Sequence, residues 1–147
     1  MAALIHGGDT EGYRLKYGRE PLDFSANCNP LGIPKSVPAA IKDAAERADR
    51  YPDPLCRRLC AALSKKIGIP SAQILCGNGA ADLIFRLAHA KKPKTALVTA
   101  PTFAEYALAL EAVGCTVIRH KLYEGEGFQL TETILGRITP DIDMLFV

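Results

Sequence analysis

Apolar and polar positions follow two different periods along most of this chain. The run TALVTA at 95–100 and the run at 143–147 are mostly apolar, which is typical of strands that are covered on both faces. Strands are therefore predicted over residues 73–76, 95–100, 115–121 and 143–147. Apolar residues three and four positions apart predict helices over residues 35–48, 55–67, 80–90 and 103–113, with a short one over 131–136.

Residues that begin and end helices delimit several of these elements. Ser36 and Thr131 are expected to be N-caps, because a hydroxyl can accept a hydrogen bond from a free helical amide. Gly68 and Gly114 are expected to end helices, because glycine readily takes the left-handed conformation there. Residues 1–34 are rich in Gly, Pro and Asn and are predicted to be irregular.

The alternation of strands and helices predicts an α/β fold with a mainly parallel sheet flanked by helices. We expect residues 1–54 to form an N-terminal arm, a substrate loop and a first helix. Residues 55–147 are expected to form the first part of a larger domain. Sites in such sheets lie beyond the carboxyl ends of the strands. Because the sequence stops at Val147, where a predicted strand ends, we expect it to be part of a longer protein.

The stretch GNGAAD at 77–82 joins a predicted strand to a predicted helix and is a candidate anion site. Glycines let the backbone approach a ligand, and the amides that open a helix favour a phosphate. A dinucleotide fingerprint is a weak alternative, because Asp82 stands where its third glycine would be, and no acidic residue ends the next strand. A glycine turn without any ligand is the remaining alternative.

Composition narrows the class of protein. The 147 residues are 48% apolar and 23% charged with a net charge of +2, so nucleic-acid binding has no support. No apolar run is long enough for a membrane span, and no signal peptide is expected. The three histidines form no metal pattern. The five cysteines form no C-x-x-C pair, so we expect reduced thiols in a cytoplasmic protein.

Five motifs in a fixed order resemble one family. They are HGGD at 6–9, DFSANCNPLG at 23–32, RYPDP at 50–54, GNGAAD at 77–82 and APTFAEY at 100–106. The set resembles the N-terminal part of fold-type-I pyridoxal-phosphate enzymes of the aminotransferase class I/II group. Within that group it is most similar to the threonine-phosphate decarboxylases of cobalamin biosynthesis. Histidinol-phosphate aminotransferases are the alternative.

This resemblance implies a pyridoxal 5′-phosphate site. The family pattern places the cofactor phosphate on the amides of Gly79, Ala80 and Ala81, and stacks Phe103 on the pyridine ring. It also implies that Tyr51 reaches the phosphate in the neighbouring subunit of a homodimer. The alternatives are a core role for Phe103 and a turn tyrosine, packed on the following helix, for Tyr51.

The same resemblance implies a small phosphorylated amino acid as substrate. The loop that would close over it contributes the candidate substrate-binding residues His6, Ser25, Asn27, Asn29, Pro30 and Gly32. A plain turn role is the alternative for Ser25 and for Asn27, and an unstructured terminus is the alternative for His6.

The lysine that carries the cofactor cannot be placed in this sequence, so the catalytic residues stay unknown. Lys91, Lys92 and Lys94 follow a predicted helix and do not match the family's lysine motif. The resemblance implies that the full-length protein is a decarboxylase, and these 147 residues alone are predicted to be inactive because they lack that lysine. A non-catalytic phosphate-binding or interaction fragment is the alternative of another class. We also expect the isolated chain to be poorly soluble or oligomeric, because the strand at 143–147 would present an open edge.

Overall fold

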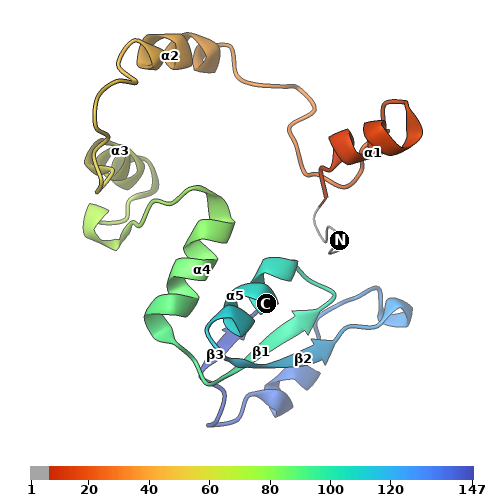
Figure 1. Cartoon of the computed structure of the whole chain (residues 1–147). Coiled ribbons are helices and arrows are strands. Elements are labelled where there is room, and N and C mark those ends of the chain that lie inside the picture. Colours follow the sequence, from red (N-terminus) through yellow and green to blue (C-terminus); the bar gives the residue numbers. More distant parts are fainter. Residues whose placement is uncertain (1–6) are drawn as a thin grey trace. The chain divides into compact units, whose positions relative to one another are not determined.

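The computed structural model describes residues 7–147 and divides the chain into two compact units, Met1–Cys56 and Arg57–Val147. The first unit holds helices α1 (Thr10–Tyr17) and α2 (Ser36–Ala45). The second unit holds the remaining elements (Figure 1). Its helices are α3 (Arg57–Ile67), α4 (Gly79–Lys91) and α5 (Ala104–Ala112), and its strands are β1 (Thr95–Ala100), β2 (Thr116–Lys121) and β3 (Met144–Phe146).

The three strands form one parallel sheet in the order β2-β1-β3. The register sets Val98 of β1 opposite Arg119 of β2 and Phe146 of β3. Because the strands are parallel, their carboxyl ends lie at the same edge of the sheet. The predicted α/β class with a mainly parallel sheet is confirmed, and β1 has the bounds that its apolar run predicted.

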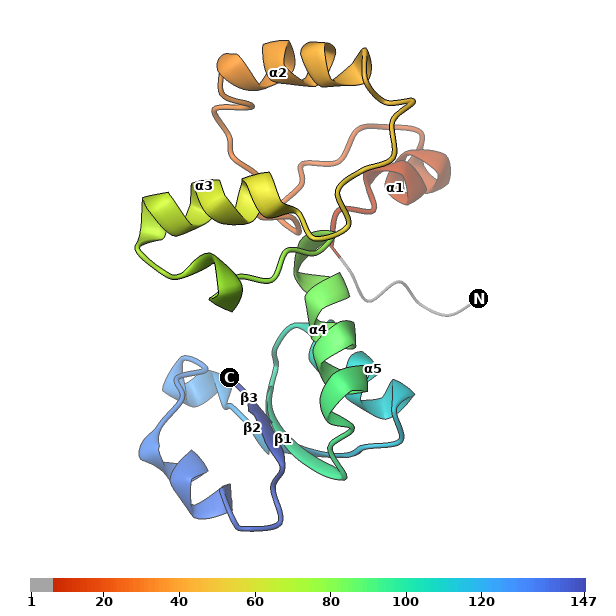
Figure 2. The same ribbon diagram turned by 90° about the vertical axis from the view of Figure 1, so that its left-hand side faces the viewer.

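Both faces of the sheet are covered. Helices α4 and α5 lie on one side, and the segment with the short 3-10 helices η2 (Glu124–Glu126) and η3 (Glu132–Arg137) lies on the other (Figure 2). Ala96 and Val98 pack with Leu110 and Cys115 in the core. Leu97 points to the opposite face, because side chains alternate along a strand.

The largest fully buried side chains are Leu97, Leu110 and Val98. Burying a side chain of this kind contributes about 1.5–3 kcal/mol. Each strand residue from Ala96 to Thr99 is buried, which explains why the sequence of β1 is apolar without alternation. This small core fixes the sheet and hence the positions of the helices that begin and end at its edges.

The predicted strand at 73–76 is wrong. Residues Ser71–Gln73 form a 3-10 helix, η1, and Ile74 is extended with φ −112° and ψ 121°. Extended backbone becomes a strand only when a neighbour pairs with it, and the sheet of the described residues consists of β1, β2 and β3. The apolar pattern therefore agrees with the extended backbone of Ile74, but it could not reveal that no strand within residues 7–147 pairs with this segment.

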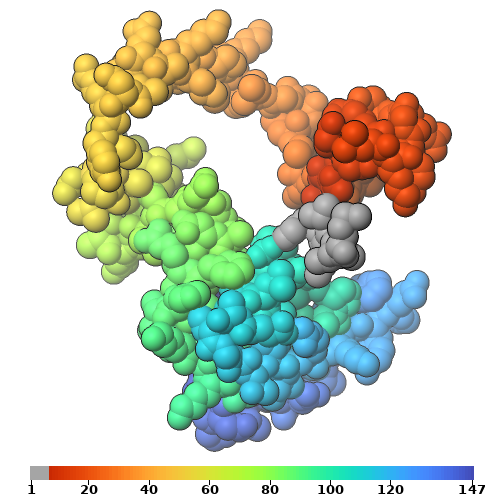
Figure 3. All heavy atoms as spheres, in the orientation of Figure 1, coloured from red at the N-terminus to blue at the C-terminus, as the bar shows by residue number. Residues whose placement is uncertain are grey.

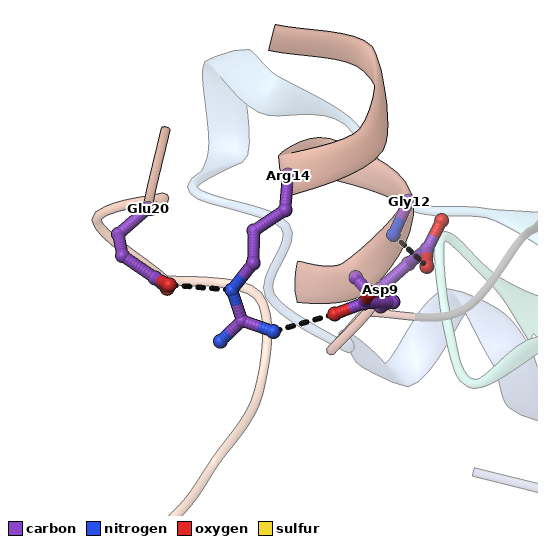
Figure 4. Close-up of polar contacts among 5 residues, drawn as sticks. Asp9, Gly12, Arg14 and Glu20 are labelled. Carbon is purple, nitrogen blue, oxygen red and sulfur yellow. Dashed lines mark hydrogen bonds and ion pairs between the residues drawn. The ribbon is translucent and has the colours of Figure 1, made fainter. Parts of the chain in front are cut away.

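The prediction of an irregular segment over residues 1–34 missed α1. Asp9 Oδ1 accepts a hydrogen bond from the amide of Gly12 at 3.0 Å, and Gly18 ends the helix with φ +64°. Arg14 bonds to Glu11 of the same helix and to Glu20 beyond its end, and Figure 4 shows the Asp9–Gly12 and Arg14–Glu20 contacts. Both capping signals were present in the sequence, but the surrounding turn formers obscured an eight-residue helix that buries no residue.

One predicted helix cap was wrong, because Lys35 rather than Ser36 occupies the N-cap of α2. Thr131 is the N-cap residue of η3, as predicted, but its hydroxyl bonds to the Thr133 hydroxyl at 2.7 Å instead of capping the backbone. The two helix-ending glycines are confirmed, with φ +74° at Gly68 and +79° at Gly114. None of the helices within residues 7–147 combines the length and apolar character that crossing a membrane requires.

Candidate functional site

The turn at residues 77–79 needs glycine at two positions for different reasons. A Cβ on Gly77 would lie 2.6 Å from both Asp82 Oδ2 and Leu83 Cδ2, so this position leaves no room for a side chain. Gly79 has φ +83°, while a Cβ there would meet no atom within 4 Å. Conformation, not space, therefore requires glycine at position 79.

The open space beside Gly79 exposes the N-terminus of α4. The N-cap residue Asn78 makes no side-chain capping bond. Gly79 and Ala80 are exposed, and Ala81 is half-buried. The first amides of a helix have no intrahelical acceptor and carry the positive end of the helix dipole. This first turn therefore fits a phosphate group, which supplies several acceptor oxygens and negative charge.

A polar network ties the two sides of this turn together, and the sequence analysis did not identify it. Asp82 Oδ2 accepts a hydrogen bond from the amide of Asn78 at 2.9 Å. Arg86 Nη1 lies 3.6 Å from the same carboxylate oxygen and donates to the carbonyl of Cys76 at 3.2 Å. The Asp82–Arg86 spacing of four residues was the available signal. Arg86 offsets the negative charge that Asp82 brings close to the candidate anion site.

Phe103 occupies the N-cap position of α5 and is not a core residue. Its side chain is 43% exposed. It meets the ring of Tyr106 edge-on, with 5.7 Å between centroids, and Tyr106 stacks on Phe146 at 4.6 Å. The neighbouring aromatic rings therefore support Phe103 from one side while part of its surface remains open to a ligand.

The phosphate turn and Phe103 belong to the same edge of the sheet. Helix α4 leads directly into β1, and α5 leaves it after a short turn, so both helices run antiparallel to β1. Both begin at the end of the sheet where β1 finishes (Figures 1 and 2). This is the edge where parallel α/β sheets bind ligands.

In the first unit, two sequence motifs come into contact. A Cβ on Gly7 would lie 1.9 Å from the carbonyl oxygen of Ser25, and the amide of Gly8 donates to Ser25 Oγ at 2.8 Å. Asp23 Oδ1 accepts from both the amide and the hydroxyl of Ser25, and these bonds lower the pKa of Asp23. Ser25 therefore holds the HGGD and DFSAN motifs together. Ser25 and Phe24 both line an open groove of about 430 Å³.

Asn29 and Gly32 form a self-contained turn. Asn29 Nδ2 donates to the carbonyl of Gly32 at 2.8 Å, and Asn29 Oδ1 accepts from the amide of Leu31 at 3.1 Å. Gly32 has φ +75° and donates its amide to Asn29 O. These contacts give both residues a structural role in this turn.

For the other three predicted site residues the structure gives only the exposure of the side chain or no description. Asn27 is exposed, and Tyr51 is 95% exposed. His6 lies outside the described residues. A separate hollow of about 540 Å³ runs along β2 and is lined by Arg119, His120 and Arg137 among others. None of the predicted site residues lines it.

Comparison with known proteins gives one family match and several close relatives. The sequence profile of aminotransferase class I and II matches residues 19–138. The threonine-phosphate decarboxylase of Salmonella typhimurium is 43% identical over 145 residues, which cover 97% of this chain and 40% of that protein. Histidinol-phosphate aminotransferase 1 of Cupriavidus pinatubonensis is 37% identical over 128 residues, which cover 86% of this chain and 34% of that protein.

A solved structure has the same fold. The histidinol-phosphate aminotransferase of Sinorhizobium meliloti, crystallised in complex with pyridoxal-5′-phosphate, matches with a TM-score of 0.74. The match is 22% identical and covers 92% of this chain and 38% of that one. The chain thus spans well under half the length of each of these three proteins.

Proposed function

The chain belongs to the aminotransferase class I and II family, and from that premise we propose that it carries part of a pyridoxal 5′-phosphate site. The observation that carries the proposal is the open first turn of α4. There Gly79 has φ +83° and no atom lies within 4 Å of where its Cβ would be. The partly exposed Phe103 lies at the same edge of the sheet, where its ring can pack against the pyridine ring of the cofactor.

Each of these residues has a distinct role in the proposed site. The amides of Gly79, Ala80 and Ala81 hold the phosphate, and the Asp82–Arg86 pair keeps the turn in shape. Phe103 lies against the pyridine ring and is held by Tyr106. When bound, pyridoxal phosphate supplies an electron sink at the α-carbon of an amino acid. The residues of this chain bind and orient that group.

We propose a phosphorylated amino acid as the substrate, with decarboxylation as the reaction of the whole protein. Decarboxylation is placed first because the identity to a threonine-phosphate decarboxylase, 43%, is higher than the identity to a histidinol-phosphate aminotransferase, 37%. Amino transfer on histidinol phosphate is the second candidate. The proposed substrate-binding residues are His6, Ser25, Asn27, Asn29 and Gly32.

We propose that the whole protein is a cytoplasmic homodimer in which Tyr51 contacts the phosphate bound by the other subunit. A phenol that is 95% exposed can donate to such a phosphate. Phe24 and Leu31 are 90% and 91% exposed, and a partner subunit would remove these apolar side chains from water. The five cysteines are all in the thiol form, which is consistent with a reducing compartment.

No lysine of this chain is proposed to carry the cofactor, and we expect the 147 residues alone to be inactive. Lys91 and Lys92 lie at the opposite end of α4 from Gly79, and twelve residues of helix span roughly 18 Å. We also propose that residues 1–54 serve as the arm and substrate loop, and that residues 55–147 serve as the first part of the cofactor domain. A non-catalytic phosphate-binding fragment is the alternative of another class.

The binding test uses pyridoxamine 5′-phosphate and pyridoxamine, because neither forms an imine with surface lysines. Calorimetry on this chain should give at least about tenfold tighter binding of the phosphorylated compound, since charge-assisted hydrogen bonds depend on the phosphate. The variant Ala80→Pro removes one amide donor at a position where proline is tolerated, and it should lose most of that preference. Glu132→Pro, in the first residue of η3, is the matched control. Equal affinity for the two compounds would overturn the proposed site.

A separate assay tests the reaction. The whole protein, supplied with pyridoxal phosphate, should release carbon dioxide from O-phospho-L-threonine. Amino transfer from histidinol phosphate to 2-oxoglutarate without carbon dioxide release would reject the decarboxylase in favour of the aminotransferase. Neither activity, with phosphate-dependent binding retained, would support the non-catalytic alternative.

A further inference from the structure

Two cysteines that the proposed function does not use lie in contact. The Sγ atoms of Cys60 and Cys76 are 3.6 Å apart, although sixteen positions separate them in the sequence. Cys60 lies on α3 with 8% of its surface exposed, and its thiol donates to the carbonyl of Ile74 at 3.7 Å. Cys76 is half-buried and directly precedes the glycine turn.

We propose that Cys60 and Cys76 form a reversible disulfide, which makes them an oxidation site that fixes α3 to the glycine turn. A disulfide has an S–S bond of about 2.05 Å, so the sulfurs must approach by only about 1.5 Å. Small rotations of two side chains supply a movement of this size. The proposal goes beyond the cofactor site and does not depend on it.

The oxidant that we assign is hydrogen peroxide. Cys76 is the more accessible thiol, so its thiolate attacks one peroxide oxygen and becomes a sulfenic acid, while the other oxygen leaves as hydroxide. The sulfur of Cys60 then attacks the sulfenic sulfur. The S–S bond forms as the S–O bond breaks, and the oxygen leaves as water. In total, two thiols lose two electrons and two protons, and one peroxide is reduced to two water molecules.

The backbone at Cys76 connects the oxidation site to the turn. The carbonyl of Cys76 accepts a hydrogen bond from Arg86, and Arg86 also faces the carboxylate of Asp82. That carboxylate in turn accepts a hydrogen bond from the amide of Asn78. A disulfide would anchor this backbone to α3. The amides of residues 77–80 are therefore expected to exchange with solvent several-fold more slowly in the oxidised chain than in the reduced chain.

The other cysteines provide internal controls. Cys115 is buried, and burial, with a smaller contribution from Asp143, raises the pKa of its thiol, so little of the reactive thiolate is present. Cys28 is exposed and belongs to the other unit. Cys56 is one helical turn before Cys60 in sequence and is the competitor that the experiment must distinguish.

The test oxidises the chain with hydrogen peroxide, blocks free thiols with iodoacetamide and maps peptides without reduction. We expect a linked peptide pair containing Cys60 and Cys76, lighter by two hydrogens and released by dithiothreitol. Cys60→Ser should abolish the link and leave Cys76 to be oxidised further, whereas Cys115→Ser and Cys28→Ser should retain it. Circular dichroism checks that each variant is folded.

Three results would overturn the proposal. They are alkylation of both Cys60 and Cys76 after peroxide treatment, a link from Cys56 to Cys60 in place of the expected one, and unchanged amide exchange at residues 77–80 in the linked form. The peptide map reads the covalent bond itself, so its outcome is independent of whether the chain binds a cofactor.

Discussion

The two units differ in what determines their conformation. Residues 57–147 enclose fully buried side chains such as Leu97 and Leu110, whereas none of the described residues 7–56 is buried. In Figure 3 the atoms of α5 lie among those of neighbouring elements of the second unit, while those of α2 form a thin strip. Local hydrogen bonds, such as those of Asn29 to its own turn, define the first unit.

The sequence motifs of the two units are accordingly positioned in different ways, by the buried sheet in the second unit and by local backbone contacts in the first. The glycine turn and Phe103 are placed by the sheet, so their geometry depends on burial within the same unit. The HGGD and DFSAN motifs are placed by backbone contacts at Ser25, while nearby apolar side chains such as Phe24 face solvent. The first unit therefore has a defined local structure but contributes little apolar burial of its own.

The largest expected effect comes from a matched pair of leucines. Leu97→Ala should lower the free energy of unfolding by about 3 kcal/mol, because it removes a fully buried side chain and leaves a cavity. Leu31→Ala, at a side chain that is 91% exposed, should change it by less than about 0.5 kcal/mol. Urea denaturation followed by circular dichroism measures both. Equal losses would contradict the contrast between the units.

A second substitution tests the backbone contact in the first unit. Gly7→Ala should open the Ser25 contact at a local cost of about 2 kcal/mol, because its Cβ would lie 1.9 Å from a carbonyl oxygen. Amide exchange at Gly8 should accelerate, while exchange in β1 should stay unchanged. Gly125→Ala is the control, because a Cβ there meets no atom within 4 Å. If the amide of Gly8 exchanges as slowly in the variant as in the original chain, the backbones at Gly7 and Ser25 are not in close contact.

A third substitution perturbs the glycine turn. The Cβ of Gly77→Ala would displace the side chains of Asp82 and Leu83, and the lost Asn78–Asp82 bond should cost about 1 kcal/mol. The effect is smaller than at Gly7, because side chains move more easily than backbone. Thermal unfolding compares this variant with Gly136→Ala, where a Cβ finds open space. A stability equal to that of the control would argue against the network.

The smallest expected effect is a pH dependence at Asp23. Hydrogen bonds from Ser25 lower the pKa of Asp23 in the folded chain, so its contribution is present above the ordinary carboxyl pKa. That contribution is lost as the pH falls through the lowered value. Amide exchange at Ser25, corrected for its intrinsic pH dependence, should therefore lose protection below about pH 4. Asp23→Asn should remove this pH dependence, and a persistent dependence would assign it to another group.

The sequence predicted most of the second unit because its signals are local. The apolar run of β1 and the helical spacing of α4 and α5 depend only on neighbouring residues. The strand at 73–76 failed because pairing depends on a distant segment. The contact of Gly7 with Ser25 likewise joins residues far apart in sequence, so no periodicity could reveal it.

The candidate site was only partly readable from the sequence. The glycines of the turn indicated an exposed helix N-terminus, and Gly79 has the positive φ that this turn requires. The support of Phe103 by Tyr106 and Phe146 could not be anticipated, because it depends on the register of β3 against β1.

The central claim is that the first turn of α4 holds the phosphate of a vitamin B6 cofactor beside Phe103. Its most direct test is a titration of the isotopically labelled chain with pyridoxamine 5′-phosphate, followed by nuclear magnetic resonance. We predict saturable shifts of the amide signals of Gly79, Ala80 and Ala81 together with the ring signals of Phe103. Saturable binding that leaves these signals unmoved, or moves only those along β2, would contradict the account.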